Sequence, residues 1–136
     1  AADVWSVTSY KELHRDALEA ERWNILHPGQ PPRVPYVSQQ LANAEGPIVA
    51  ASDYVKALPD SICRWMPRKL IALGTDGFGR SDGRDALREF FEVDHRFVTL
   101  ATLSYLAQLG AIQTEVVAKA MKDMDISPDK ANPMIS

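Results

Sequence analysis

The residues best suited to chemistry lie together in residues 74–82, Gly-Thr-Asp-Gly-Phe-Gly-Arg-Ser-Asp, a segment that we call the glycine loop. An acid and an arginine in so short a loop can form a bidentate ion pair, or the arginine can be offered to another subunit. We expect Asp76 and Arg80 to pair within the loop. We therefore single out Asp76, Gly77, Gly79 and Arg80 as a structural or interface loop rather than as catalytic groups.

The glycines of this loop carry a separate prediction. Three glycines in six residues favour a tight turn, so at least one of Gly74, Gly77 and Gly79 should adopt a positive φ. Successive backbone amides in such a loop can also form a nest for an anion. The loop has neither the lysine of a P-loop nor the G-x-G-x-x-G spacing, so it identifies no nucleotide.

No other part of the sequence has a spacing typical of a catalytic or metal centre. The three histidines are far apart and none belongs to an H-x-x-x-H pair; they are His14, His27 and His95. Acidic pairs at i, i+2 do not share a helix face, and we interpret them as solvated charges. Asp76 and Asp82 lack the alternating acids of an EF-hand loop. The sequence therefore predicts no catalytic, cofactor-binding or metal-binding residue.

Two predicted elements position the glycine loop. Residues 70–73, Leu-Ile-Ala-Leu, indicate a buried strand directly before it. Residues 84–91 place Leu87, Phe90 and Phe91 on one helical face, which indicates a helix directly after it. A strand followed by a glycine-rich loop that opens a helix is where open α/β folds present backbone amides to ligands.

The remaining elements alternate between strands and helices. We expect strands at residues 4–7 and 47–51. The first helix is expected to start at the capping box of Ser9 and Glu12 and to run to about residue 22. Another should start from an N-cap at Asp53 and break at Pro59. Three more helices are expected at residues 36–42, 95–109 and 114–123. This order predicts a single α/β domain, in three layers, with a small and mostly parallel sheet flanked by helices.

Composition excludes several classes of protein. The chain has 136 residues, 46% of them hydrophobic and 24% charged, which is ordinary for one globular domain. A net charge of −3 argues against nucleic-acid binding, and Lys119 and Lys122 are too few cations for phosphate contacts along a helix. No apolar run approaches 18 residues, so no membrane span is expected. A lone Cys63 excludes a disulfide within the chain, fits a reduced cytoplasm, and is expected in the core.

Several blocks of the sequence resemble one family. The glycine loop with residues 85–94, Asp-Ala-Leu-Arg-Glu-Phe-Phe-Glu-Val-Asp, is similar to the C-terminal domain of the homodimeric pyruvate dehydrogenase decarboxylases of the transketolase-like family. Further blocks agree in the same order, namely residues 3–9, 21–28, 32–37, Asp53 with Tyr54, Lys130 and Asn132 with Pro133. The resemblance extends over essentially the whole chain.

The resemblance implies a function that belongs to a larger enzyme. Members of that family oxidatively decarboxylate pyruvate and acetylate lipoyl groups, using thiamine diphosphate and magnesium held by domains upstream of this one. It implies partners in those domains, in a second subunit and in the dihydrolipoyl acetyltransferase. None of the family's cofactor or general-base residues falls on residues 1–136, so assembly is the expected role. A small ligand-binding or regulatory domain using the glycine loop is the alternative, and DNA binding ranks third.

The resemblance also implies that the chain is an N-terminally truncated domain, which has lost a strand and a helix. An apolar edge should then be exposed near residues 1–8 or 47–51, and the chain should self-associate.

Overall fold

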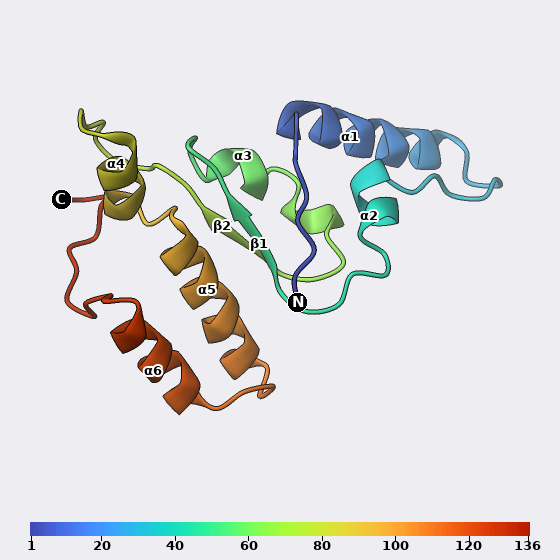
Figure 1. The fold of residues 1–136 in the computed structure, drawn as a ribbon. Helices are drawn as coiled ribbons and strands as arrows, with labels where there is room; N and C mark the ends of the chain where they lie inside the picture. Colours follow the sequence, from blue (N-terminus) through green and yellow to red (C-terminus); the bar gives the residue numbers. More distant parts are fainter. The chain divides into compact units, whose positions relative to one another are not determined.

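The computed structural model describes residues 1–136. Its elements are α1 (Tyr10–Leu26), α2 (Tyr36–Gln40), β1 (Ile48–Ala51), α3 (Ala57–Asp60), the 3₁₀ helix η1 (Cys63–Trp65), β2 (Leu70–Leu73), α4 (Arg84–Phe90), α5 (His95–Gln108) and α6 (Thr114–Asp123) (Figure 1). They fall into two compact units, residues 1–44 with 57–67 and residues 45–56 with 68–136. No helix combines the length and the apolar character needed to cross a bilayer.

The first unit is built on α1, which begins where the capping box predicts. The Glu12 amide donates a hydrogen bond of 3.2 Å to Ser9 Oγ, which supplies an acceptor to one of the four free amides of the first turn. Ala17 and Ala20 are buried on the face of α1 that packs against α2 and α3. Small side chains there let the helices approach closely. Pro59 is tolerated in α3 because it lies in the first turn of that helix.

Two expectations for this part of the chain are wrong. The helix expected from Asp53 begins at Ala57, and the Tyr54 amide binds Ser52 Oγ at 3.0 Å instead. Cys63 is exposed, because Ile62, only 1% exposed, occupies the core position in that turn.

The strand expected at residues 4–7 is also absent. This segment is coil, and Val4 and Trp5 are 95% and 56% exposed. An alternating pattern becomes a strand only where another strand supplies hydrogen-bonding partners, and β1 and β2 pair only with each other.

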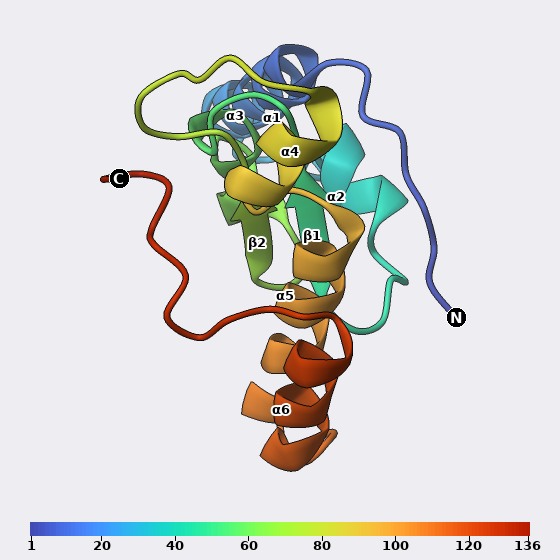
Figure 2. The same cartoon turned by 60° about the vertical axis from the view of Figure 1, so that its left-hand side comes forward.

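The second unit contains the sheet. β1 and β2 are parallel, with Ile48 opposite Leu70 and Ala51 opposite Leu73. α5 packs against β1 and α6 packs against α5, so α5 lies between the sheet and α6 (Figure 2). Leu70, Phe91, Val93 and Ile126 form the buried core. The parallel pair with its covering helices confirms the predicted α/β class.

Candidate functional site

The candidate site lies where β1 and β2 end. Because Ala51 pairs with Leu73 in a parallel sheet, the residues that follow the two strands leave the sheet at the same edge. Thr75 Oγ1 donates a hydrogen bond of 2.7 Å to the main-chain oxygen of Asp53, and the Thr75 amide donates one of 2.9 Å to Tyr54. These bonds fix the start of the glycine loop against the segment that follows β1.

Asp76 and Arg80 do not form the predicted ion pair. Asp76 Oδ1 accepts a hydrogen bond of 3.2 Å from the Lys56 amide. Arg80 Nη2 donates one of 3.2 Å to the Ser136 carbonyl oxygen, and its guanidinium lies 4.2 Å from the centre of the Phe90 ring. Each side chain therefore fastens the glycine loop to a different neighbouring segment of the same unit.

The prediction of a positive φ in this loop is confirmed at Gly77, where φ is +97°. A Cβ at Gly77 would lie 2.7 Å from the Pro133 carbonyl oxygen, so the residue is also needed for close packing. A Cβ at Gly74 would lie 2.6 Å from the Tyr54 oxygen, whereas one at Gly79 would meet nothing within 4 Å. Gly74 and Gly77 are thus constrained by neighbouring backbone and Gly79 is not.

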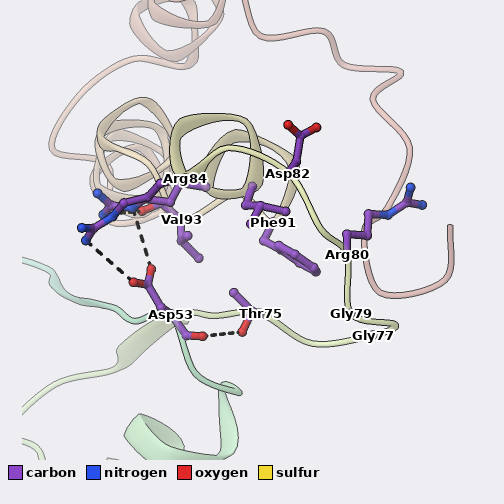
Figure 3. A pocket seen from close by; sticks show the side chains of 11 residues that line it. Asp53, Thr75, Gly77, Gly79, Arg80, Asp82, Arg84, Phe91 and Val93 are labelled. Atoms are coloured by element: carbon purple, nitrogen blue, oxygen red, sulfur yellow. Dashed lines mark hydrogen bonds and ion pairs between the residues drawn. The ribbon is translucent and has the colours of Figure 1, made fainter.

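The loop and α4 enclose a cleft of about 450 Å³. α4 presents Arg84 and Arg88 to it, and Leu87, Phe91 and Val93 supply its apolar wall. Figure 3 shows the Asp53 carboxylate facing Arg84 across the cleft, with Phe91 between α4 and the loop. Asp53 Oδ2 lies 3.9 Å from Arg84 Nη2, and Asp53 Oδ1 lies 3.8 Å from Arg88 Nε.

Both ion pairs are longer than hydrogen bonds. The donors of Arg84 face solvent, since its side chain is 78% exposed. Arg88 Nε is a buried atom with no hydrogen-bond partner, and Arg88 Nη2 reaches only the Val93 oxygen at 3.4 Å. A buried polar atom left in this state costs about 1–3 kcal/mol. An oxygen atom placed in the cleft beside Arg88 would remove that cost.

The other polar clusters have evident structural uses. Asp94 caps α5 by accepting hydrogen bonds from the Arg96 and Phe97 amides, at 3.0 and 3.1 Å. Burial raises the pKa of this carboxyl, but the bonds from Phe97 and Arg96 outweigh it and hold the pKa below its ordinary value of 3.8. In α1, burial alone raises the pKa of Tyr10.

The histidines occupy separate places and form no site together. His14 meets the edge of Trp65 at 5.6 Å between ring centres, His27 stacks on Trp23 at 4.2 Å, and His95 is exposed. No three or more His, Cys, Asp or Glu side chains gather as they would to hold a metal ion.

Sequence reasoning missed the groups that define the cleft. Asp53 was expected as an N-cap, and neither Thr75 nor the arginines of α4 were singled out. The signal available for the arginines is their spacing: Arg84 and Arg88 are at i, i+4 and therefore share one face of α4.

A parallel strand pair followed by a glycine loop and a helix defines a small α/β domain. The family described as the transketolase-like TK C-terminal domain matches residues 1–94, and the chain belongs to this family. The family expected from the sequence blocks is thereby confirmed.

Close relatives agree with this assignment. The chain is 52% identical over 134 residues to the pyruvate dehydrogenase E1 component of Pseudomonas aeruginosa, covering 98% of the chain and 15% of that relative. It is 47% identical over 136 residues to the protein of that name from Escherichia coli K12, and the match covers 99% of the chain and 15% of that relative. It is 44% identical over 133 residues to the Mycobacterium tuberculosis protein of that name, and the match covers 98% of the chain and 14% of that relative. The chain thus spans about 15% of the length of the curated relatives it matches.

Proposed function

We propose that the chain is the C-terminal part of a pyruvate dehydrogenase E1 component, and that it serves assembly of that enzyme rather than its chemistry. One observation carries the proposal: relatives with that name match almost the whole chain at 44–52% identity. In this proposal residues 1–136 are one transketolase-like domain of a cytoplasmic enzyme.

The parent enzyme of this proposal oxidatively decarboxylates pyruvate and transfers the acetyl group to a lipoyl group. Thiamine diphosphate supplies the carbanion chemistry, and it is held with magnesium by the rest of the polypeptide. Two of the acid and base groups support a non-catalytic part, because they are used to hold the fold. Asp94 caps α5, and His27 Nδ1 lies 2.8 Å from the Trp23 oxygen.

The partners that follow from the proposal are the rest of the polypeptide, a second subunit and the dihydrolipoyl acetyltransferase. Several large apolar side chains are available for such contacts. Phe78 at the tip of the glycine loop is 85% exposed, and Val4, Ile25 and Ile135 are 95%, 78% and 83% exposed.

Adding the chain back to a shortened relative tests the proposal. The segment that matches this chain is deleted from the Pseudomonas aeruginosa relative, and the 136-residue chain is then added as a separate polypeptide. We expect the shortened relative to lose pyruvate-dependent acetyl transfer and its dimer, and the added chain to restore part of both. A shortened relative that remains dimeric and fully active would contradict the assembly role.

The alternative, a small ligand-binding or regulatory domain, is favoured by one observation, the unsatisfied Arg88 Nε in the cleft beside the glycine loop. It is compatible with membership of a larger enzyme, since a domain used for assembly can also bind an effector. DNA binding has no comparable support, because Lys119, one of the two lysines of α6, is held by Asp123 at 2.6 Å.

A further inference from the structure

We propose that the cleft between the glycine loop and α4 binds a small organic oxyanion, a carboxylate or a phosphate monoester with an apolar body. Its charged oxygens would lie between Arg84 and Arg88, and its apolar part against Leu87, Phe91 and Val93. All residues that line the cleft belong to the second unit.

The place of the cleft in the fold is the first argument. Ligands of open α/β sheets bind outside the carboxyl ends of the strands, where loops from neighbouring strands diverge. Here Asp53 follows β1 and Thr75 follows β2, and the two residues are joined by a hydrogen bond of 2.7 Å. The cleft opens directly beyond them, with α4 as its opposite wall.

The charges that face the cleft are the second argument. In Figure 3 the Asp82 carboxylate points away from Asp53 and Thr75, and Arg80 is directed toward the C-terminal segment. Asp82 Oδ1 accepts a hydrogen bond of 2.6 Å from the Gly83 amide, and Arg80 binds Ser136. Arg80 and Asp82 are still among the lining residues, and their charges cancel. The two guanidinium groups of α4 and the single carboxylate of Asp53 then leave an excess of one positive charge.

The unused donors of the arginines are the third argument. A guanidinium has five N–H donors and binds a carboxylate or phosphate through two of them at once. The Arg84 side chain is 78% exposed and its contact to Asp53 is 3.9 Å long, so its donors are open to a ligand, and Arg88 Nε is buried without an acceptor. Asp53 is too far from both to satisfy them, whereas an oxyanion inside the cleft would bind both arginines.

The size and lining of the cleft select the kind of oxyanion. A volume of about 450 Å³ lies within the range of small-molecule sites, about 300–1,000 Å³. Leu87, Phe91 and Val93 form an apolar wall next to the arginines, so a ligand with a ring or short alkyl group should bind more tightly than an inorganic anion.

A purely structural role for the arginines makes a different prediction. If Arg84 and Arg88 served only to hold Asp53, replacing Asp53 would loosen the cleft and weaken any anion binding. If the cleft is an anion site, Asp53 competes with the ligand for the same donors. The substitution Asp53→Asn should then strengthen binding, by about threefold or more, because it removes the repulsion between two anions.

The test is a titration of the 136-residue chain, followed by ¹⁵N–¹H NMR at low ionic strength. The probes are inorganic phosphate, phenyl phosphate and phenylacetate, with phenol as the neutral control. We expect the amides of Thr75, Gly77 and Gly79 to shift, phenyl phosphate to bind about tenfold more tightly than phosphate, and phenol to cause no shift. Tighter binding of phenylacetate than of phenyl phosphate identifies the ligand as a carboxylate, and the reverse order identifies a phosphate ester.

Matched variants decide whether the arginines are responsible. Arg88→Gln and Arg84→Gln should each weaken phenyl phosphate binding about tenfold or more, as expected for loss of a charge-assisted pair. Arg22→Gln in α1 removes the same charge far from the cleft residues in sequence, and should change the affinity less than about twofold. Unchanged affinity in both cleft variants, equal loss in Arg22→Gln, or weaker binding in Asp53→Asn would overturn the proposal. The spectrum of each unliganded variant shows directly that its fold is retained.

Discussion

Gly77 lies directly against the C-terminal segment, so that a Cβ added to it would be 2.7 Å from the Pro133 carbonyl oxygen and 2.9 Å from Met134 Cα. Its φ of +97° is also one that residues with a Cβ rarely adopt. The glycine loop is therefore in contact with the C-terminal segment around Pro133, more than fifty residues further along the chain. Arg80, bound to the Ser136 oxygen, fastens the same two segments together.

Replacing Gly77 with alanine should therefore destabilise the protein more than the same change at Gly79. Gly77→Ala adds a Cβ where the backbone is left-handed and where main-chain atoms leave no space, so we expect a loss above about 1 kcal/mol. Gly79 is the matched control, since a Cβ there meets nothing within 4 Å and its φ is outside the left-handed region. Gly79→Ala should change the free energy of unfolding, measured with urea, by less than about 0.5 kcal/mol. Equal losses in the two variants would contradict this account.

The cap of α5 should make stability depend on acid pH. Burial raises the pKa of Asp94, but the hydrogen bonds from Phe97 and Arg96 outweigh it, so the folded pKa is below the ordinary value of 3.8. A depressed carboxyl pKa means that the unfolded chain takes up the proton first. The stabilisation is therefore fully present above about pH 4 and is lost as the pH falls through the folded pKa.

Asp94→Asn keeps a side-chain oxygen for capping and removes the charge. We expect it to lower the free energy of unfolding by about 0.3–1 kcal/mol at pH 6, the contribution of a negative charge at a helix N-terminus, with the difference from the natural chain shrinking steadily below pH 4. Urea titrations from pH 6 to pH 2.5 measure this, and Asp3→Asn in the exposed N-terminal coil is the control. A difference that is constant over this range would contradict the role of the charge.

Local signals were sufficient for much of the fold. Ser9 starts α1 because its hydroxyl and the Glu12 amide are three residues apart, and this pairing needs nothing from the rest of the chain. β2 and the helix after the glycine loop followed from runs of apolar residues in the same way. A positive φ at one of the three loop glycines was predictable as well, since clustered glycines rarely have another use; the structure places it at Gly77.

Contacts that join distant segments were not predictable from the sequence. Asp76 pairs with the Lys56 amide and Arg80 with Ser136, although the two side chains are only four residues apart. The role of Asp53 in the cleft depends on the parallel pairing that brings the ends of β1 and β2 to one edge. The expected strand at residues 4–7 failed for the same reason, because whether a strand forms depends on a partner elsewhere.

The chain alone should not bind thiamine diphosphate in a magnesium-dependent way. This follows from the proposal that the cofactor is held with magnesium by the remainder of the parent enzyme, and no three or more His, Cys, Asp or Glu side chains of this chain gather as they would to hold a metal ion. Titration calorimetry with thiamine diphosphate and magnesium should give no magnesium-dependent affinity below about 100 μM, which is about −5.5 kcal/mol. The full-length Pseudomonas aeruginosa relative is the positive control. Tighter magnesium-dependent binding by the isolated chain would refute the prediction.

The exposed N-terminal segment should promote self-association. Val4 and Trp5 are 95% and 56% exposed, and they are followed by Val7 at 41%. Apolar side chains in an unpaired extended segment favour contact with a second copy. Sedimentation velocity should show dimers or larger species that decrease in Val4→Ser and Trp5→Ser, but not in Val116→Ser in α6, where the side chain is 47% exposed. A monomer at millimolar concentration would rule this out.

A last prediction concerns Glu21 in α1, which holds the turn of η1. Glu21 Oε1 accepts a hydrogen bond of 2.8 Å from Trp65 Nε1, and its other oxygen pairs with Arg64. Trp65 is partly buried, so removing the acceptor leaves its indole N–H without a partner and costs about 1 kcal/mol or more. Glu21→Ala should lower the free energy of unfolding by that amount and shift the tryptophan emission to longer wavelength.

Two further variants separate the hydrogen bond from the charge. Glu21→Gln retains an oxygen acceptor for Trp65 Nε1 but loses the ion pair with Arg64, whose side chain is 59% exposed. An exposed ion pair contributes little, about 0–1 kcal/mol, so Glu21→Gln should recover most of the stability lost in Glu21→Ala. Glu19→Ala, on the same helix and 4.0 Å from Arg22, removes only an exposed pair and should be close to neutral. If Glu21→Gln is as destabilised as Glu21→Ala, the ion pair and not the indole hydrogen bond holds this turn.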